Sequence, residues 1–252
     1  MKIGIVGYGV VGKANAQGFE ELGHTVVVHD KILNTKINDV LDCDICFVCT
    51  QENAVEDVVK ELFLYHYTGI VAIRSTIEPG TIDNLIERFR MPICYVPEFL
   101  RERCAYDDFV DCELLAIGTY SIVDARKIVE AYKHLPKHIE YLTPNEAEIL
   151  KIYNNSYAAL RIVFANIMNN LCETYNADYS IVKQTFEKTG KTSGQYLTVS
   201  KELKGFGGMC LPKDTKKLQD VLQKNNLHFD LIDAIIKDNN KFETTVFKGM
   251  RK

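Results

Sequence analysis

Three glycines near the amino terminus constrain the fold of this chain more than any other feature. The run GYGVVG places Gly7, Gly9 and Gly12 in the spacing G-x-G-x-x-G, directly after the apolar, strand-like residues 2–6. A helix-forming pattern follows, and then a second strand-like run, HTVVVH, that ends at His29. This order of strand, glycine turn, helix and strand predicts a βαβ unit with two parallel strands.

The glycine turn has the chemistry of a dinucleotide-binding site. Gly7 permits a tight turn, Gly9 lets a pyrophosphate approach the backbone, and Gly12 lets the helix and the strand pack closely. The pyrophosphate would meet N–H groups at the positive end of the helix. Asp30, at the tip of the second strand, can accept hydrogen bonds from both ribose hydroxyls and would repel a 2′-phosphate. The pattern therefore favours NAD over NADP; a glycine-rich turn that binds no ligand is the alternative.

Strand-like and helix-like segments continue to alternate up to residue 142. Further strands are expected over 44–50, 70–74, 93–96, 112–118 and 139–142, and helices over 53–64, 79–89 and 121–134. This alternation predicts an α/β domain over residues 1–142, with a Rossmann-type, doubly wound parallel sheet. The connection between Asp30 and the strand at Asp44 is short, which leaves barely enough room for one crossover.

Composition excludes several classes of function. The net charge is −4 at pH 7, and basic residues are interspersed with acidic ones, so no surface is expected to attract nucleic acid or an anionic membrane. No apolar run approaches the ~20 residues that span a bilayer, and the amino terminus lacks a signal-peptide pattern. Of the eight cysteines, Cys43, Cys46 and Cys49 lie in one strand-like run, and these three are interpreted as small hydrophobic residues in a reducing cytosol rather than as metal ligands. We therefore expect a cytoplasmic protein without a metal site.

From residue 143 onward the pattern becomes helical. Thr143 can cap a helix that carries Pro144 and Glu146 in its first turn and runs to about residue 175. Its apolar residues recur at three- and four-residue steps: Ile149, Ile152, Tyr153, Ala159, Leu160, Val163, Ile167 and Leu171. Further helices are expected over 178–188, 211–218 and 227–247. We predict an all-α domain over 143–252 and a homodimer through the helix at about 144–175, with packing inside one chain as the alternative explanation of the stripe.

Four stretches, together with GYGVVG, resemble one family, the UDP-glucose/GDP-mannose 6-dehydrogenases. They are RSTIEPGT (74–81), VPEFLRE (96–102), AEILKIYNNSY (147–157) and GFGGMCLPKDT (205–215), and they follow the family's order along nearly the whole chain. The resemblance implies an NAD-dependent, four-electron oxidation of the 6-hydroxymethyl group of a nucleotide sugar to a carboxylate. UDP-glucose is the first candidate substrate.

The cysteine stretch can perform that chemistry. A Cys210 thiolate can trap the intermediate aldehyde as a thiohemiacetal, and loss of a second hydride then gives a thioester that water cleaves. Gly205, Gly207 and Gly208 leave an approach path to the sulfur because they carry no Cβ. Asp214 would face the same way as Cys210 if the segment that follows the cysteine is helical.

The resemblance also implies roles for residues elsewhere in the chain. Lys151 and Asn155 lie four residues apart, so one helix face would present an ammonium and an amide to an oxyanion. By resemblance Lys151 stabilises the oxyanion, Asn155 and Asp214 position the water, and Glu98 is the base for thioester hydrolysis. The expected catalytic residues are Cys210, Lys151, Asn155, Asp214, Glu98 and Thr76. Expected substrate contacts are Glu98, Phe99, Leu100, Arg101, Glu102, Lys151, Asn155, Lys191, Tyr196 and Gly207. Expected cofactor contacts are Gly7, Tyr8, Gly9, Val10, Val11, Gly12, Asp30, Thr50, Thr76, Glu102 and Lys213.

Two departures from the family keep other interpretations open. Lys191 stands where the family has a substrate-binding arginine, and lysine offers a point charge rather than a planar fork. The family continues beyond the long helix into a second nucleotide-type domain, whereas this sequence stops at Lys252. One alternative is therefore a non-catalytic protein that holds NAD or a nucleotide sugar, or a subunit completed by another chain. A second alternative is a related β-hydroxyacid dehydrogenase with one hydride transfer, in which Cys210 would be idle.

Overall fold

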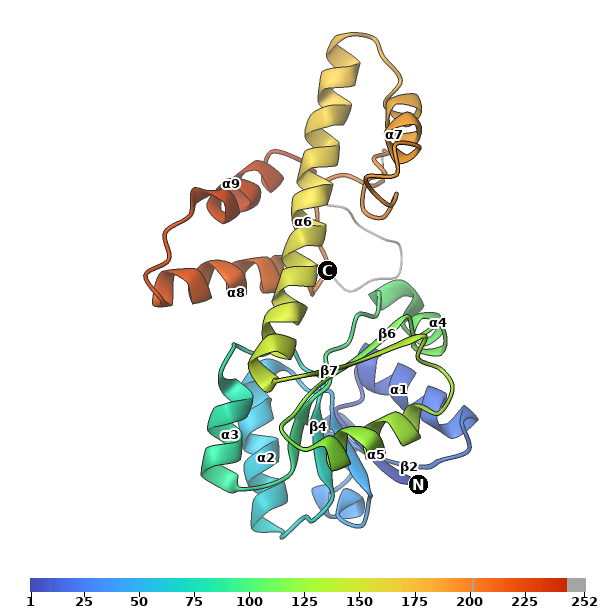
Figure 1. The fold of residues 1–252 in the computed structure, drawn as a ribbon, viewed down its shortest axis with the longest axis vertical. Coiled ribbons are helices and arrows are strands. Elements are labelled where there is room, and N and C mark those ends of the chain that lie inside the picture. Colours follow the sequence, from blue (N-terminus) through green and yellow to red (C-terminus); the bar gives the residue numbers. More distant parts are fainter. Residues whose placement is uncertain (201, 244–252) are drawn as a thin grey trace. The chain divides into compact units, whose positions relative to one another are not determined.

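A computed structural model describes residues 1–200 and 202–243 (Figure 1). The chain divides into two compact units, residues 1–151 and residues 152–252. Among the described residues, no helix has the length and apolar character needed to cross a membrane.

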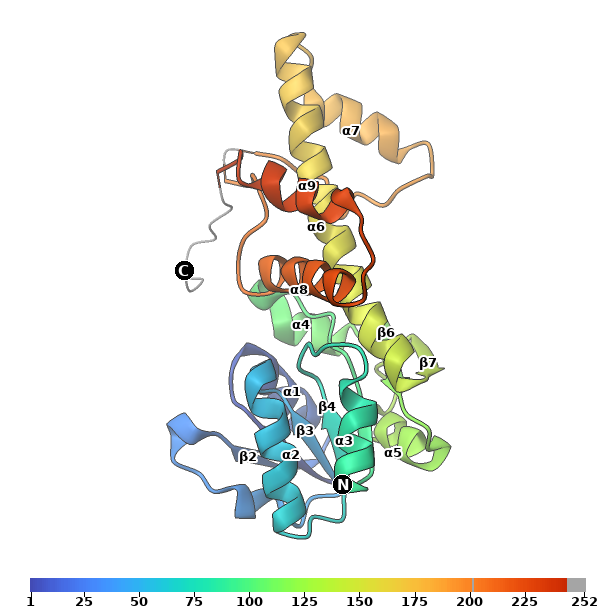
Figure 2. The same cartoon turned by 90° about the vertical axis from the view of Figure 1, so that its left-hand side faces the viewer.

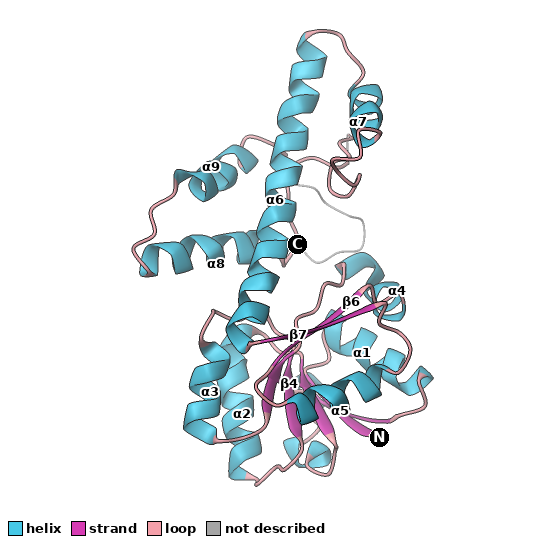
Figure 3. Cartoon of the chain, in the orientation of Figure 1, coloured by secondary structure: helices cyan, strands magenta, loops and turns pink. Residues whose placement is uncertain are grey.

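In the described part of the chain, the first unit is built around one seven-stranded sheet (Figure 3). The strands are β1 (Lys2–Val6), β2 (Thr25–His29), β3 (Ile45–Val48), β4 (Ile70–Ile73), β5 (Ile93–Tyr95), β6 (Leu114–Gly118) and β7 (His138–Leu142), in the spatial order β2-β1-β3-β4-β5-β6-β7. The neighbours from β2 to β5 are parallel, with Gly4 of β1 opposite both Val27 and Cys46. The predicted βαβ start of the chain is confirmed.

The predicted doubly wound sheet is mostly parallel, and its last two strands run opposite to the others. β6 meets β5 in antiparallel fashion through the pair Tyr95–Gly118, and β7 is parallel to β6. The chain between β5 and β6 contains a 3₁₀ turn, η4 (Glu102–Cys104), and the six-residue helix α4 (Ala105–Val110). The chain returns to the sheet through this turn and helix, and β6 then enters the sheet in the direction opposite to β5.

Helices cover both faces of the sheet (Figures 1 and 2). One face holds α2 (Val55–Leu64) and α3 (Thr81–Phe89), and the other holds α1 (Val10–Glu21), α4 and α5 (Ile122–Tyr132). Successive side chains of a strand point to opposite faces, so Cys46 and Val48 of β3 join the first core and Ile45 and Phe47 join the second. The sheet is doubly wound, as predicted, and strands buried on both faces give the apolar runs seen in the sequence.

The second unit is helical, as the pattern predicts. The long helix α6 (Pro144–Thr174) begins in the first unit and continues into the second, and α7 (Tyr179–Glu187), α8 (Leu211–Lys224) and α9 (Asp230–Asn239) follow it. Ala159 and Val163 of α6 share a small core with Phe206 and with Ile235 of α9. Helix α9 is shorter than the helix expected over 227–247, and residues 244–247 of that prediction lie outside the described residues.

Candidate active site

The glycine turn after β1 has the shape that a bound pyrophosphate requires. Gly7 has a φ of +94°, and a Cβ there would lie 2.9 Å from the backbone of Cys49 at the end of β3. A Cβ at Gly12 would lie 1.9 Å from the carbonyl oxygen of Gly7, whereas nothing lies within 4 Å of a Cβ at Gly9. Gly9 is the N-cap of α1, and no side chain caps this helix. The turn therefore offers open backbone at a helix N-terminus, where an anion binds well.

Asp30 lies beside this turn at the end of β2. Its Oδ2 accepts a hydrogen bond from the backbone N–H of Tyr8 at 2.6 Å, and its Oδ1 accepts one from the N–H of Ile32 at 2.7 Å. The hydrogen bond from Tyr8 is the main reason that the pKa of Asp30 lies below its ordinary value. An ionised carboxylate at this position suits ribose hydroxyls and disfavours an extra phosphate.

Two threonines follow the next two strands of the sheet. The Thr50 Oγ1, just beyond β3, is buried and has no hydrogen-bond partner within residues 1–200 and 202–243, so this hydroxyl can bind a ligand. Thr76 is buried beyond β4, in the segment that leads to α3. Parallel strands present their carboxyl ends at one edge of a sheet, which is where dinucleotides bind in this fold. The unpaired Thr50 hydroxyl, the open glycine turn and the Asp30 carboxylate together fit NAD. Of the two other expected cofactor contacts at the start of α1, Val10 is exposed and Val11 is half-buried.

Glu98 and Lys151 form a buried ion pair within the first unit. The Lys151 Nζ lies 3.0 Å from Glu98 Oε1 and also donates to the backbone carbonyl of Glu98. Glu98 Oε2 accepts a hydrogen bond from the N–H of Leu100 at 2.7 Å, and the Phe99 ring centre lies 5.6 Å from the Lys151 Nζ. Burial opposes the charge on Glu98, but the Lys151 ammonium, the Arg74 guanidinium and the N–H of Leu100 together outweigh it and lower the pKa of Glu98. Glu98 is therefore an ionised carboxylate.

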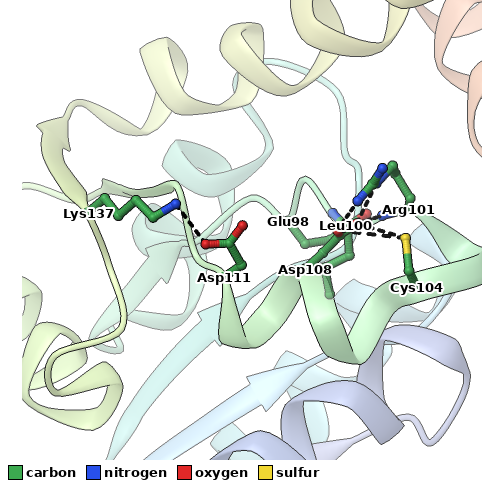
Figure 4. Close-up of polar contacts among 7 residues, drawn as sticks. All are labelled: Glu98, Leu100, Arg101, Cys104, Asp108, Asp111 and Lys137. Carbon is green, nitrogen blue, oxygen red and sulfur yellow. Dashed lines mark hydrogen bonds and ion pairs between the residues drawn. The ribbon is translucent and has the colours of Figure 1, made fainter. Parts of the chain in front are cut away.

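The segment after β5 is held in shape by its own polar contacts (Figure 4). The Asp108 carboxylate accepts hydrogen bonds from the Arg101 backbone N–H at 2.7 Å and from two guanidinium nitrogens at 3.0 and 2.6 Å. The Cys104 Sγ lies 3.6 Å from the same carboxylate. The guanidinium of Arg101, an expected substrate contact, is thus engaged by α4, and Glu102 begins the turn η4 in a half-buried position.

In the second unit, Cys210 is the N-cap residue of α8. Asp214, in the first turn of that helix, is fully buried, and its Oδ2 accepts a hydrogen bond from Asn155 Nδ2 at 2.5 Å. The Lys213 Nζ lies 3.4 Å from the other oxygen of Asp214. The helix expected after Cys210 is present, and the structure brings Asn155 and Asp214 into direct contact.

The loop between α7 and α8 holds Lys191 and Tyr196. Both side chains are exposed, and Tyr196 has a φ of +60°. Arg161 of α6 donates a hydrogen bond to Thr192 Oγ1 at 3.1 Å and another to the carbonyl of Ser193. A guanidinium therefore contacts the loop that carries Lys191, where the sequence indicated only an ammonium.

Gly205 has a role that differs from the one expected. It is buried, and a Cβ there would lie 2.7 Å from Asn239 Oδ1. Gly205 therefore makes room for a side chain of α9 instead of opening a path to Cys210. Gly207 is half-buried, and Gly208 is exposed with a φ of +76°, so only these two glycines remain candidates for an approach path.

Glu148 is a residue of this region that sequence reasoning missed. It is fully buried on α6, and its carboxylate accepts hydrogen bonds from the N–H groups of Gly80 at 2.7 Å and Ile82 at 2.8 Å. Burial raises the pKa of Glu148 to about 7. The contact ties the start of α6 to the segment that carries Thr76, and the position of Glu148 three residues before Lys151 in AEILK was the available signal.

Comparisons with known proteins find similar dehydrogenases. Residues 145–241 match the model of the UDP-glucose/GDP-mannose dehydrogenase family, central domain. The UDP-glucose 6-dehydrogenase TuaD of Bacillus subtilis is 31% identical over 188 residues, which cover 70% of this chain and 40% of TuaD. The UDP-glucose 6-dehydrogenase of Rickettsia bellii is 28% identical over 180 residues, covering 68% of this chain and 41% of that protein. The chain therefore spans less than half the length of these two relatives.

A solved structure supports the fold. The structure of a UDP-glucose dehydrogenase from Pyrobaculum islandicum superposes with a TM-score of 0.86 at 23% identity, and the match covers 95% of this chain and 68% of that one. The resemblance found in the sequence is thus confirmed, and the chain belongs to the UDP-glucose/GDP-mannose dehydrogenase family, whose members use NAD.

Proposed function

We propose that this chain catalyses the NAD-dependent, four-electron oxidation of the 6-hydroxymethyl group of a nucleotide sugar to a carboxylate. Oxidation of UDP-glucose to UDP-glucuronate is the first reaction to test. The observation that carries the proposal is the buried hydrogen bond between Asn155 and Asp214, one turn after Cys210 at the start of α8. A protein that only binds NAD or a nucleotide sugar needs no nucleophile beside a buried carboxylate and amide.

The first unit supplies the groups for the cofactor. The glycine turn at residues 7–12 would hold the pyrophosphate, and Asp30 would hold the ribose. The hydroxyls of Thr50 and Thr76 would contact the nicotinamide end of the cofactor. Further proposed contacts are Glu102 and Lys213. When bound, NAD accepts one hydride in each of two oxidations.

Cys210 keeps the aldehyde bound between the two oxidations. Its thiolate forms a carbon–sulfur bond to the aldehyde carbon, and the resulting alkoxide takes up a proton to give a thiohemiacetal. Loss of a hydride and of the hydroxyl proton gives a thioester. Water then adds to the thioester carbon, the carbon–sulfur bond breaks, and the thiolate leaves. In sum, one alcohol, one water and two NAD⁺ give one carboxylate, two NADH and three protons.

Charged and polar groups of the chain assist these steps. Lys151 supplies positive charge for the oxyanions, and the ionised Glu98 takes a proton from the attacking water. Asn155 and Asp214 orient that water. The substrate is held by the segment 98–102 and by Lys191, Tyr196 and Gly207.

The test is the number of NADH molecules formed per molecule of UDP-glucose. We expect two for the wild-type chain and loss of steady-state turnover in Cys210→Ser. The matched control is Cys112→Ser, at a half-buried cysteine of the first unit, which should keep the wild-type ratio.

Two results would refute the proposal. If protein that binds NAD turned over no UDP- or GDP-sugar, the chain would be a binding protein or a subunit completed by another chain. One NADH per sugar, unaffected by Cys210→Ser, would indicate a single oxidation in which the cysteine has no role.

A further inference from the structure

A side chain of α9 holds the backbone of the segment that leads to Cys210. Asn239 Oδ1 accepts a hydrogen bond from the N–H of Phe206 at 2.8 Å, and Asn239 Nδ2 donates one to the carbonyl of Phe206 at 3.0 Å. One amide group thus satisfies both backbone groups of a single residue, as a residue in a neighbouring strand would do.

Other contacts fix the same point of the chain. The Phe206 side chain is buried in the small core with Val163 of α6 and Ile235 of α9. The N–H of Gly205 donates to the carbonyl of Glu243 at 3.0 Å. Gly205 has no room for a side chain because Asn239 Oδ1 occupies that space.

The loop segment 207–209, which leads to Cys210, is therefore held at both of its ends. Phe206 is fixed by Asn239, and α8 begins with Cys210 as its N-cap and with the buried Asp214 in its first turn. Only residues 207–209 lie between Phe206 and the cysteine. Helices α8 and α9, which carry the two anchors, lie side by side (Figure 2).

We propose that Asn239 is a positioning residue that sets where this loop places the Cys210 sulfur. Asn239 acts through the backbone of Phe206 and not on the reacting atoms. The inference rests on the proposed function, in which Cys210 is the nucleophile, but the anchoring can be measured without turnover. Displacement of a reacting group by about 1 Å can cost roughly 100-fold in rate.

Asn239→Asp tests the two-point contact directly. A carboxylate at this position still accepts from the N–H of Phe206, but it cannot donate to the carbonyl of Phe206 and it repels that oxygen. A protonated carboxyl group regains the missing donor. Six charged residues lie within four positions of Phe206 or Asn239 in the sequence: Glu202, Lys204, Lys237, Asp238, Lys241 and Glu243. Asp238 and Lys241 form an ion pair. All six are the same in the wild type and the variant, so their titration cancels in the ratio of the two rates.

We expect kcat of Asn239→Asp to be roughly 10- to 100-fold below that of the wild type at about pH 8. The ratio of variant to wild type should rise as the pH falls toward about 5, and KM for NAD should not change. Hydrogen exchange in a peptide spanning residues 206–210 should become faster in Asn239→Ala, and in Asn239→Asp at the higher pH. The control is Asn240→Asp, which adds the same charge at an exposed neighbouring position and should leave every readout unchanged.

The outcomes separate the inference from the proposed function. Unchanged exchange at residues 206–210 in Asn239→Ala would overturn the anchoring. A loss of kcat in Asn239→Asp that does not vary with pH would overturn the positioning role, because a loss of packing does not titrate. If Asn239→Ala does not fold, Gly205→Ala displaces the Asn239 side chain from the opposite side and gives the same exchange readout. If the wild type oxidises no nucleotide sugar, the proposed function fails while the exchange measurement still decides the anchoring.

Discussion

The carboxylate of Glu148, a residue of α6, accepts hydrogen bonds at the N-terminus of α3. The first N–H groups of a helix have no partner inside it, and the Glu148 carboxylate accepts two hydrogen bonds there, from Gly80 and Ile82. A negative charge at this end of a helix is favourable. Burial nevertheless dominates, and the nearby Asp83 acts in the same direction, so the pKa of Glu148 is raised to about 7.

This raised pKa predicts a pH-dependent contribution to stability. The folded-state pKa of about 7 lies above the ordinary value of 4.5, so the folded protein binds this proton more tightly than the unfolded chain does. Glu148 therefore stabilises the fold most below pH 4.5, and this contribution is lost as the pH rises through 7, by up to about 3 kcal/mol. The difference in the free energy of unfolding between the wild type and Glu148→Gln, from urea titrations, should fall by this amount between about pH 4.5 and 8.

An exposed glutamate on α3, the helix whose N-terminus Glu148 contacts, provides the control. Glu87 is exposed on α3, so Glu87→Gln removes one surface carboxylate without touching the contact between Glu148 and the start of this helix. A difference between the wild type and Glu148→Gln that does not vary with pH would show that burial does not govern this carboxylate.

The structure agrees with the sequence-based prediction where a helix is marked by residues at its own start. Thr143, Pro144 and Glu146 predict the start of the long helix, and α6 does begin at Pro144, with the Glu146 carboxylate accepting from the N–H of Thr143 at 2.8 Å. Helix α4 was missed because six residues are too few to show a periodic pattern. The antiparallel pairing of β6 with β5 could not be predicted, because the direction of a strand depends on how the chain returns to the sheet, which the strand's own residues do not reveal.

The segment before α4 depends on one carboxylate for its shape. Asp108→Asn keeps the size of the side chain but removes the charge that accepts the Arg101 guanidinium at two points. We expect trypsin to cleave this segment roughly fivefold faster in the variant, because loss of about 1 kcal/mol favours local opening by that factor. The measurement is the rate of appearance of the peptide that ends at Arg101.

Asp107 provides a matched control for the helix start. It is an exposed acid in the same first turn of α4, so Asp107→Asn removes the same charge from the helix N-terminus without touching Arg101. Equal cleavage rates in the two variants would mean that the Arg101–Asp108 contact does not hold the segment.

For the molecule as a whole, the sequence indicates candidate site residues but not the residues that they contact. Motif order placed Lys151, Glu98, Asn155 and Asp214 in the candidate site. Their contacts join residues 53 and 59 positions apart, and the Asn239 contact with Phe206 spans 33 positions. Such pairs are decided by how helices pack, which no local pattern contains. Asn239 could therefore be recognised only once α9 and the cysteine loop were seen together.

The long helix also exposes an apolar face in the single chain. Ile152, Ala159 and Val163 of the predicted stripe are buried within the chain. Tyr153, Ile167 and Leu171 of the same stripe are exposed, as are Tyr157 and Phe164 beside them. At 100° per residue these five lie within about 80° of one another around the helix axis. Packing inside the chain thus accounts for part of the stripe, and we propose that a second copy of this chain covers the exposed part.

A charge at the centre of this face should separate the two copies. In a twofold dimer each residue of the patch meets the same patch on its partner, so Phe164→Glu would bury two like charges in an apolar contact. We expect the wild type to sediment as a dimer at micromolar concentration and Phe164→Glu to sediment as a monomer with unchanged helical circular dichroism. Ile181→Glu makes the same kind of change at an exposed apolar residue of α7 and should leave the dimer intact. A monomeric wild type, or a variant that remains dimeric, would show that this face is not the contact between copies.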